Sequence, residues 1–405
     1  MNRLVLYDID SEIPNLALMK LSAFHKRQGW SVRLVRVRGV RPPPEVEADK
    51  RLGSVVFYRA TSAARVARLR ARYGEGIACG GSGVSLAARL PPEVEASIPD
   101  YTLYRHTKYA LGFLTRGCNK RCAFCVVPAK EGPIKRRSDS FEDFVPKGQR
   151  NVMLLDDNLL SYEGVEALLE EIILRNYAVN FNQTLDIAYL SEPIFRLLRR
   201  IDYRNARFNN RMIYFSLNYP RTIQHFRARR EWLREFGEDC VTVVCIYGFD
   251  TSLSQDYERF RWLKRLRLIP FFQEYWPIPG VPARLPTQFF DMDLRPFIRL
   301  TFRSNGYNWE KYLRWLNRFH FQTFGRFFRP LLEILFRYNN KHCYDWYRRR
   351  PELLTDELYR DFRDSPPKGF ACWSDYIERD KRARGTPQRI RAIFHSFQED
   401  VESEL

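Results

Sequence analysis

The sequence predicts an α/β protein with a small parallel domain first, a longer series of strand and helix units next, and a helical region last. Short apolar runs alternate with amphipathic segments over residues 1–100 and again over residues 101–290, which is the pattern of parallel βα units. Proline-bearing stretches interrupt this pattern, and residues 291–405 show helical spacing with many charges. We therefore expect three parts with these boundaries.

The first part, residues 1–100, is expected to be a Rossmann-like parallel domain. Its expected strands cover residues 3–7, 31–37, 54–58 and 76–83, and its expected helices cover residues 14–28 and 62–72. The last strand enters a glycine turn at residues 80–83. Such a turn serves either as a simple tight turn or as a cradle for a phosphate or nucleotide tail.

The middle part is predicted to contain six strands separated by helical stretches. The clearest helix covers residues 163–175, where apolar side chains recur at helical spacing on one face. Six units are too few to close an eight-stranded barrel. The expected strands are residues 110–114, 151–155, 178–181, 212–217, 241–246 and 269–274.

The loop after the first of these strands holds three closely spaced cysteines. Cys118, Cys122 and Cys125 have the spacing C-x3-C-x2-C, and Phe124 precedes the third. Three thiolates in one loop suit three irons of a cubic [4Fe-4S] cluster, which leaves the fourth iron open to another ligand. The alternatives are a structural zinc site, which needs a fourth Cys or His nearby, and a cluster that only carries electrons.

The cysteine spacing and the aromatic residue together resemble the signature of the radical S-adenosylmethionine (radical SAM) superfamily. The resemblance implies a partial (β/α)6 barrel over residues 101–290. The runs at 151–158 and 180–186 are similar to those of radical SAM proteins with a shortened cobalamin-binding-like first domain. The D-x-H-x-x-G motif of that domain is missing, and His25 falls within an expected helix. Cobalamin could therefore bind only without a histidine ligand, and it is not the favoured expectation.

Polar residues after the strands are the candidate ligands of S-adenosylmethionine, because loops at the C-terminal ends of parallel strands converge. Asp156 and Asp157 stand where the superfamily usually has a glycine-rich motif, and they would oppose the charge of the methionine ammonium. Amides and hydroxyls suit ribose hydroxyls or a polar substrate. The turn after the fifth strand matches the place of adenine in the superfamily. The candidate cofactor-binding residues are Phe124, Asp156, Asp157, Asn158, Asn182, Gln183, Asp186, Ser216, Asn218, Tyr247 and Gly248.

The resemblance also implies a reaction. The methionine part of S-adenosylmethionine would bind the open iron, and one electron from a ferredoxin or flavodoxin would release methionine and a 5′-deoxyadenosyl radical. That radical would abstract hydrogen from a substrate, and neither the later fate of the substrate nor a catalytic side chain follows from the sequence. The competing hypothesis is a non-catalytic nucleic-acid-binding protein with a structural or redox cluster.

The charge balance leaves the substrate class open. The net charge is +19, which indicates either a polyanionic partner or arginines that face solvent. Residues 291–350 hold 13 Lys and Arg against 5 Asp and Glu, with aromatic residues between them. Basic and aromatic groups together bind single-stranded nucleic acid, but the helical spacing of the aromatics also fits a core. A small molecule or peptide is the favoured substrate, and a nucleic acid such as tRNA is the alternative.

The remaining cysteines indicate a reducing compartment. They are scattered singly, and the sequence shows neither a secretory signal nor a stretch of about 18 apolar residues. We expect a cytoplasmic protein with no membrane association.

Overall fold

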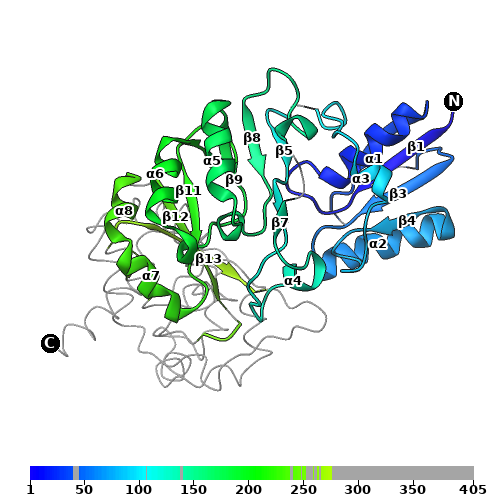
Figure 1. The fold of residues 1–405 in the computed structure, drawn as a ribbon. Coiled ribbons are helices and arrows are strands. Elements are labelled where there is room, and N and C mark those ends of the chain that lie inside the picture. Colours follow the sequence, from blue (N-terminus) through cyan, green and yellow to red (C-terminus); the bar gives the residue numbers. More distant parts are fainter. Residues whose placement is uncertain are drawn as a thin grey trace, which may run out of the picture. The chain divides into compact units, whose positions relative to one another are not determined.

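The computed structural model describes residues 1–275, except 40–44, 106, 137–139, 238–239, 248, 252–258, 260–261 and 264–265. The chain falls into two compact units, one formed by Met1–Tyr214 and one that begins at Phe215. Figure 1 labels their helices and strands. The predicted C-terminal helical region, with its basic and aromatic segment, lies outside the described residues. The three domain boundaries drawn from the sequence stay a prediction.

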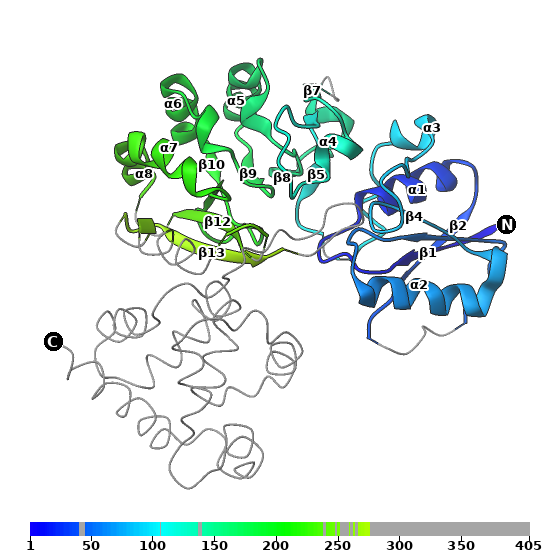
Figure 2. The same cartoon turned by 90° about the horizontal axis from the view of Figure 1, so that it is seen from below.

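The first sheet consists of four parallel strands in the order β2-β1-β3-β4. Two helices cover its opposite faces, as Figure 2 shows. The strands are β1 (Arg3–Asp8), β2 (Ser31–Arg36), β3 (Lys50–Ser54) and β4 (Ala78–Gly80), and the helices are α1 (Leu16–Arg27), α2 (Ala60–Tyr73), the short 3-10 helix η1 (Gly74–Gly76) and α3 (Pro92–Glu95).

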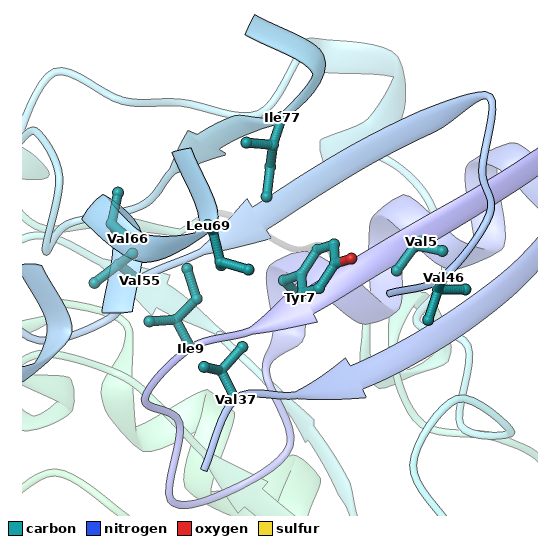
Figure 3. Close-up of a cluster of buried hydrophobic side chains, with 9 residues drawn as sticks. All are labelled: Val5, Tyr7, Ile9, Val37, Val46, Val55, Val66, Leu69 and Ile77. Carbon is teal, nitrogen blue, oxygen red and sulfur yellow. The ribbon is translucent and has the colours of Figure 1, made fainter. Parts of the chain in front are cut away.

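The side chains of β1 explain why a helix lies on each face of the sheet. Tyr7 belongs to the buried cluster that includes Leu69 of α2 (Figure 3). Leu6, its neighbour in the strand, packs with Leu18 of α1 on the other face. Successive side chains of a strand point to opposite faces, so a strand covered on both sides is a continuous apolar run. This confirms the expected strand at the start of the chain.

The expected third strand, residues 54–58, was placed too late in the sequence. The strand is β3, which ends at Ser54. The carboxylate of Asp10 accepts hydrogen bonds from the backbone N–H groups of Val56 and Phe57, at 2.8 and 3.0 Å, and from the hydroxyl of Ser62 at 2.7 Å. These amides are therefore held by a side chain rather than by a neighbouring strand. The apolar residues after Ser54 form a loop although their composition favours a strand.

The second sheet is also parallel, with the order β10-β9-β8-β5. The two-residue strand β10 was missed in the sequence, and the three others confirm expected strands. Helix α5 confirms the predicted amphipathic helix, because its apolar stripe is buried. The elements are β5 (Ala110–Gly112), η2 (Phe141–Asp143), β8 (Asn151–Leu154), η3 (Leu159–Ser161), α5 (Val165–Leu174), β9 (Ala178–Phe181), η4 (Ile187–Tyr189), α6 (Glu192–Arg200) and β10 (Asp202–Tyr203).

The third sheet has the order β11-β12-β13, with β12 and β13 parallel. All six strands expected in the middle part are therefore present, in two sheets. The partial barrel that would join them stays an expectation. The elements are β11 (Ile213–Ser216), η5 (Pro220–Thr222), α7 (Ile223–Ala228), α8 (Arg230–Glu235), β12 (Val241–Tyr247) and β13 (Ile269–Glu274). In the part of the chain that the structure describes, no helix has the length and apolar character that a membrane crossing needs.

Two tyrosines of the segment between the first and second sheets fasten it to both. The Tyr104 hydroxyl donates to the buried carboxylate of Asp8 at 3.0 Å. The Tyr101 hydroxyl donates to the carbonyl oxygen of Phe144 at 2.6 Å and accepts from the N–H of Leu111 in β5 at 3.1 Å. Burial raises the pKa of both phenols, so both stay protonated donors. These hydrogen bonds thus connect Asp8 of the first sheet and Leu111 of β5 to the segment between the two sheets.

Candidate functional site

The cysteine loop is closed at its neck by a short antiparallel pair, β6 (Thr115–Arg116) and β7 (Lys135–Arg136). The N–H of Cys118 donates to the carbonyl oxygen of Gly132 at 3.0 Å. Gly117 has φ of +91°, and a Cβ there would lie 2.5 Å from the carbonyl oxygens of Gly132 and Pro133. Only glycine fits this close approach of two backbones. Gly117, directly before the first cysteine, therefore allows the two backbone segments at the neck of the loop to lie close together.

The three thiols are half-buried, and backbone groups point at two of them. The N–H groups of Lys120 and Val127, the latter in α4 (Val127–Lys130), donate to the sulfurs of Cys118 and Cys125 at 3.4 and 3.5 Å. Burial, with smaller contributions from the nearby charges of Cys122 and Cys118, raises the pKa of the Cys125 thiol to about 11. A metal that binds this thiol must therefore displace its proton.

These residues fit an iron–sulfur cluster by their chemistry. Thiolates are soft ligands that select iron–sulfur clusters, zinc or copper(I). Hydrogen bonds to the sulfurs are among the factors by which a protein sets the reduction potential of a cluster. Within the described ranges, no three Cys, His, Asp or Glu side chains gather closely enough to hold one metal ion. In a cubic cluster each thiolate binds a different iron, so the three sulfurs need not meet around one ion.

Asp156, two residues beyond the end of β8, holds the start of the cysteine loop. Its carboxylate accepts from the N–H of Leu114 at 3.2 Å, from the N–H of Thr115, and from the Thr115 hydroxyl at 2.7 Å. The side chain is buried, and burial raises its pKa to about 6 although the three donors oppose that shift. The predicted contact between this carboxylate and the methionine ammonium stays a prediction.

The next two residues contact the same loop further along. Asp157 accepts from the N–H of Gly117 at 3.0 Å, and the side-chain amide of Asn158 donates to the sulfur of Cys118 at 3.3 Å. Burial raises the pKa of Asp157 to about 6. The buried Oδ1 of Asn158 has no hydrogen-bond partner within the described chain. An acceptor left unpaired in this way suits a donor group on a ligand.

Another contact to the cysteine loop comes from Asp186, which directly precedes η4 in the segment after β9. Asp186 caps η4 by accepting from the N–H of Ala188 at 3.1 Å, and it also forms an ion pair with Lys120. The Lys120 ammonium lies 5.4 Å from the centre of the Tyr189 ring. Of the other candidates in this segment, Asn182 is half-buried and Gln183 is exposed. Phe124 is half-buried within the loop itself.

The remaining candidates belong to the second unit. Ser216 ends β11, and the Asn218 side chain accepts from the N–H of Ile246 at 3.0 Å. Tyr247 ends β12, whereas Gly248 lies outside the described residues. Their placement around a common cofactor stays a prediction.

The sequence missed Arg259, which lies in the same unit and is the largest fully buried side chain among the described residues. Its guanidinium donates to the carbonyl oxygens of Leu217, Asn218 and Ile246 at 2.9 to 3.0 Å and so ties together the ends of two strands. Its surroundings in the sequence carry no pattern that would have revealed this role.

Arg116, next to Gly117, was missed as well. Its guanidinium lies 3.9 Å from the centre of the Phe113 ring and forms ion pairs with Glu95 at 3.4 Å and Glu131 at 3.3 Å. Glu95 ends α3, so the first part of the chain contacts the neck of the cysteine loop through this pair. The position of Arg116 at the start of the cysteine motif is the signal that could have drawn attention to it.

His25 is a core residue. Its Nδ1 lies 2.9 Å from the carbonyl oxygen of Leu21, and its ring packs edge-on against Phe24 and Trp30. Burial lowers its pKa, so the ring stays neutral near pH 7. This agrees with its expected place in a helix and gives it a structural role.

The glycine turn after β4 packs against the loop that follows β3. A Cβ on Gly81 would lie 2.3 Å from the carbonyl oxygen of Val55, and one on Gly83 would lie 2.5 Å from that of Phe57. The glycines therefore allow two backbones to touch. This favours the tight-turn interpretation over a phosphate cradle.

Comparison with known proteins gives relatives from one group of enzymes, and no family model matches the chain. The tRNA-2-methylthio-N(6)-dimethylallyladenosine synthase of Aquifex aeolicus is 24% identical over 223 residues, which cover 47% of this chain and 49% of the relative. The enzyme of the same name from Roseobacter denitrificans is 44% identical over 62 residues, 14% of each chain. The chain thus spans about half the length of the first of these relatives.

Among solved structures, Streptococcus suis SuiB bound to S-adenosylmethionine matches with a TM-score of 0.31 and 12% identity, over 59% of this chain and 57% of that one.

The relatives are radical SAM proteins, and the superfamily's cysteine signature stands in a loop directly after the first strand of the second parallel sheet. Cys118, Cys122 and Cys125 with Phe124 thus agree with the relatives found over about half of the chain. In its cysteine signature and in these relatives, the chain is similar to the radical S-adenosylmethionine superfamily.

Proposed function

We propose that this protein is an enzyme that binds a [4Fe-4S] cluster through Cys118, Cys122 and Cys125 and abstracts hydrogen from an RNA, with tRNA as the first candidate. The bound cluster and S-adenosylmethionine would supply a 5′-deoxyadenosyl radical and methionine, using one electron from a ferredoxin or flavodoxin. The protein would bind, orient and shield these groups from water. The observation that carries the proposal is the cysteine loop, in a chain whose relatives are named for a tRNA product.

Asn158 and Asp157 are the described residues best suited to the methionine part of S-adenosylmethionine. Asn158 offers a buried oxygen without a hydrogen-bond partner in the described chain, next to Cys118. Leaving such a buried acceptor unpaired costs about 1–3 kcal/mol of stability. A hydrogen bond from the ammonium group would remove this cost. Asp157 adds negative charge beside it, as the cationic ammonium requires.

The choice of RNA over a small molecule or peptide rests on the relatives and on charge. Helix α2 holds four arginines and no acidic residue, and Arg70 and Arg72 in it are exposed. With a net charge of +19, such faces attract a polyanion. The aromatic spacing that favours a small molecule or peptide lies in residues outside the described part of the chain. The relatives and the charge therefore carry the choice of RNA.

The test is to measure 5′-deoxyadenosine formed by reduced, cluster-loaded protein with labelled S-adenosylmethionine. Separate reactions receive tRNA, DNA and a pool of cell metabolites and peptides, and the Cys118, Cys122, Cys125 triple alanine variant is the matched control. We expect the tRNA pool to raise cleavage several-fold above background. Stimulation by the metabolite pool alone would refute the RNA assignment, and a loaded enzyme that cleaves nothing with any pool would refute the enzymatic proposal.

A further inference from the structure

Asp156–Asn158, which follow β8 after Leu155, are called the β8 tip below. They contact the cysteine loop at successive points: Asp156 at Leu114 and Thr115, Asp157 at Gly117, and Asn158 at Cys118. Every contact runs from a side chain of the tip to the loop, over about forty residues of sequence. Three adjacent side chains thus hold consecutive parts of one loop.

We infer that the β8 tip is the anchor that fixes the conformation of the cysteine loop, and that the Asn158 amide sets the reduction potential of the bound cluster through its hydrogen bond to the Cys118 sulfur. The inference rests on the proposed cluster and assigns positioning roles to residues that were expected only to touch S-adenosylmethionine.

The expected effect of Asn158 on the reduction potential follows from the charge of the cluster. One electron added to the cluster makes it more negative, and that charge is shared by the sulfurs. An N–H group aimed at a sulfur stabilises the reduced form more than the oxidised form, and hydrogen bonds to the sulfurs are among the factors that set cluster potentials. Removing the Asn158 donor should therefore make the cluster harder to reduce. A purely structural residue would change stability without changing the potential.

The anchoring role of the β8 tip follows from the hydrogen bond that the Asp157 carboxylate accepts from the cysteine loop. Asp157 accepts the N–H of Gly117, whose positive φ and tight backbone contact leave the neck little freedom. Asparagine at this position keeps an oxygen acceptor and loses the charge, whereas alanine loses both. Comparison of the two variants separates an anchor, which needs only the acceptor, from a partner of the methionine ammonium, which needs the charge.

The first experiment is a redox titration of the full-length protein, reconstituted anaerobically and reduced stepwise with dithionite, with the reduced cluster followed by electron paramagnetic resonance. At the wild-type midpoint, we expect Asn158→Ala to lower the ratio of reduced to oxidised cluster by about fivefold, the factor that one net hydrogen bond represents. Asn158→Leu, which keeps the volume without a donor, serves if alanine fails to fold. Asn151→Ala is the matched control, because Asn151 lies at the other end of β8 and donates to the carbonyl of Lys108 at 3.3 Å.

The second experiment measures the rate at which an iron chelator strips the cluster. We expect Asp157→Ala to lose iron on the order of fivefold faster than wild type and Asp157→Asn to stay within about twofold of it. Binding of S-adenosylmethionine by each loaded variant is measured in parallel.

The outcomes separate this inference from the proposed function. Wild-type protein that holds no cluster would refute the proposed function itself. Wild type that holds a cluster, with an unchanged midpoint in both Asn158 variants, would refute the tuning role. Equal iron loss in wild type and both Asp157 variants, together with weaker S-adenosylmethionine binding in both, would show a ligand site and refute the anchor.

Discussion

At the scale of single residues, burial and hydrogen bonding act in opposite directions on the groups around the cysteine loop. The Asp156 carboxylate accepts three hydrogen bonds that favour its charged form, yet its burial is large enough to raise its pKa to about 6. Cys125 is likewise shifted upward by burial although a backbone N–H opposes the shift. In both groups the loss of solvation on burial outweighs the hydrogen bonds that favour the charged form.

The cysteines provide the first prediction at this scale. Replacing Cys118, Cys122 and Cys125 together by alanine should abolish iron binding, because no thiolate of the loop remains. Cys79→Ala is the control, since Cys79 is a half-buried thiol near Gly53 in the first sheet. Iron and sulfide content after anaerobic reconstitution is the measurement. A triple variant that keeps a full cluster would contradict the assignment of the ligands.

The Asp156 carboxyl predicts a dependence of stability on pH. Its pKa is about 6 in the folded protein against 3.8 for an ordinary Asp, so the folded state takes up the proton first as the pH falls. The stability it contributes is fully present below pH 4 and is lost as the pH rises through 6. This change in the free energy of unfolding is at most about 3 kcal/mol, at roughly 1.4 kcal/mol per pKa unit.

Denaturant unfolding of wild type and Asp156→Asn at pH 5 and pH 7 checks this expectation. The variant should be less stable overall, because its amide cannot accept at every donor that the carboxylate meets. Wild type should lose stability from pH 5 to pH 7 relative to the variant. Parallel pH profiles for the two proteins would show that Asp156 titrates alike in the folded and unfolded states.

At the scale of elements, the connections beyond the strand ends decide which residues meet. Asp10 turns the chain out of the sheet after β3, and Gly81 lets the turn after β4 lie against that loop. Gly117 has the same function at the neck of the cysteine loop. In each case a polar or close contact to the backbone, rather than apolar burial, defines where an element ends.

Gly81 provides the prediction at this scale. Its φ is +100° and a Cβ would overlap the carbonyl oxygen of Val55, so Gly81→Ala should destabilise the protein by about 2 kcal/mol or more. Gly80→Ala is the control from the preceding position, because a Cβ there meets nothing within 4 Å. The shift of the urea midpoint is the measurement. Equal midpoints for the two variants would contradict the close contact.

At the scale of the whole molecule, the excess of basic residues is the property that no single element explains. Some of the arginines are used inside the protein, as Arg116 and Arg259 show. Others, such as Arg70 and Arg72 on α2, face solvent. The structure therefore divides the arginines between internal contacts and exposed faces, and the polyanionic partner stays a prediction.

This charge predicts a strong effect of salt on RNA binding. If about four phosphates are neutralised, the affinity should fall on the order of a hundredfold between 50 and 200 mM salt, because condensed counterions are released on binding. The affinity for S-adenosylmethionine, measured under the same conditions, is the control and should change little. An RNA affinity that is independent of salt would contradict the electrostatic basis of the RNA proposal.

The sequence by itself determined the features that depend on neighbours along the chain. The spacing of the three cysteines defines the metal loop, and apolar periodicity defines all six strands of the middle part and helix α5. Predictions from local sequence were wrong at residues 54–58, where the distant carboxylate of Asp10 binds the backbone amides. They also missed β10, because a strand of two residues is too short to show a pattern.

Only the tertiary structure decided what the polar residues after β8 touch. Asp156 and Asn158 meet Leu114, Thr115 and Cys118 across 40 to 42 positions of sequence, because parallel pairing places the end of β8 beside the end of β5. The identity of a carboxylate or an amide shows that it accepts or donates a hydrogen bond, but its partner depends on which strand lies next to it. That choice is made by packing over the whole sheet, which no local pattern records.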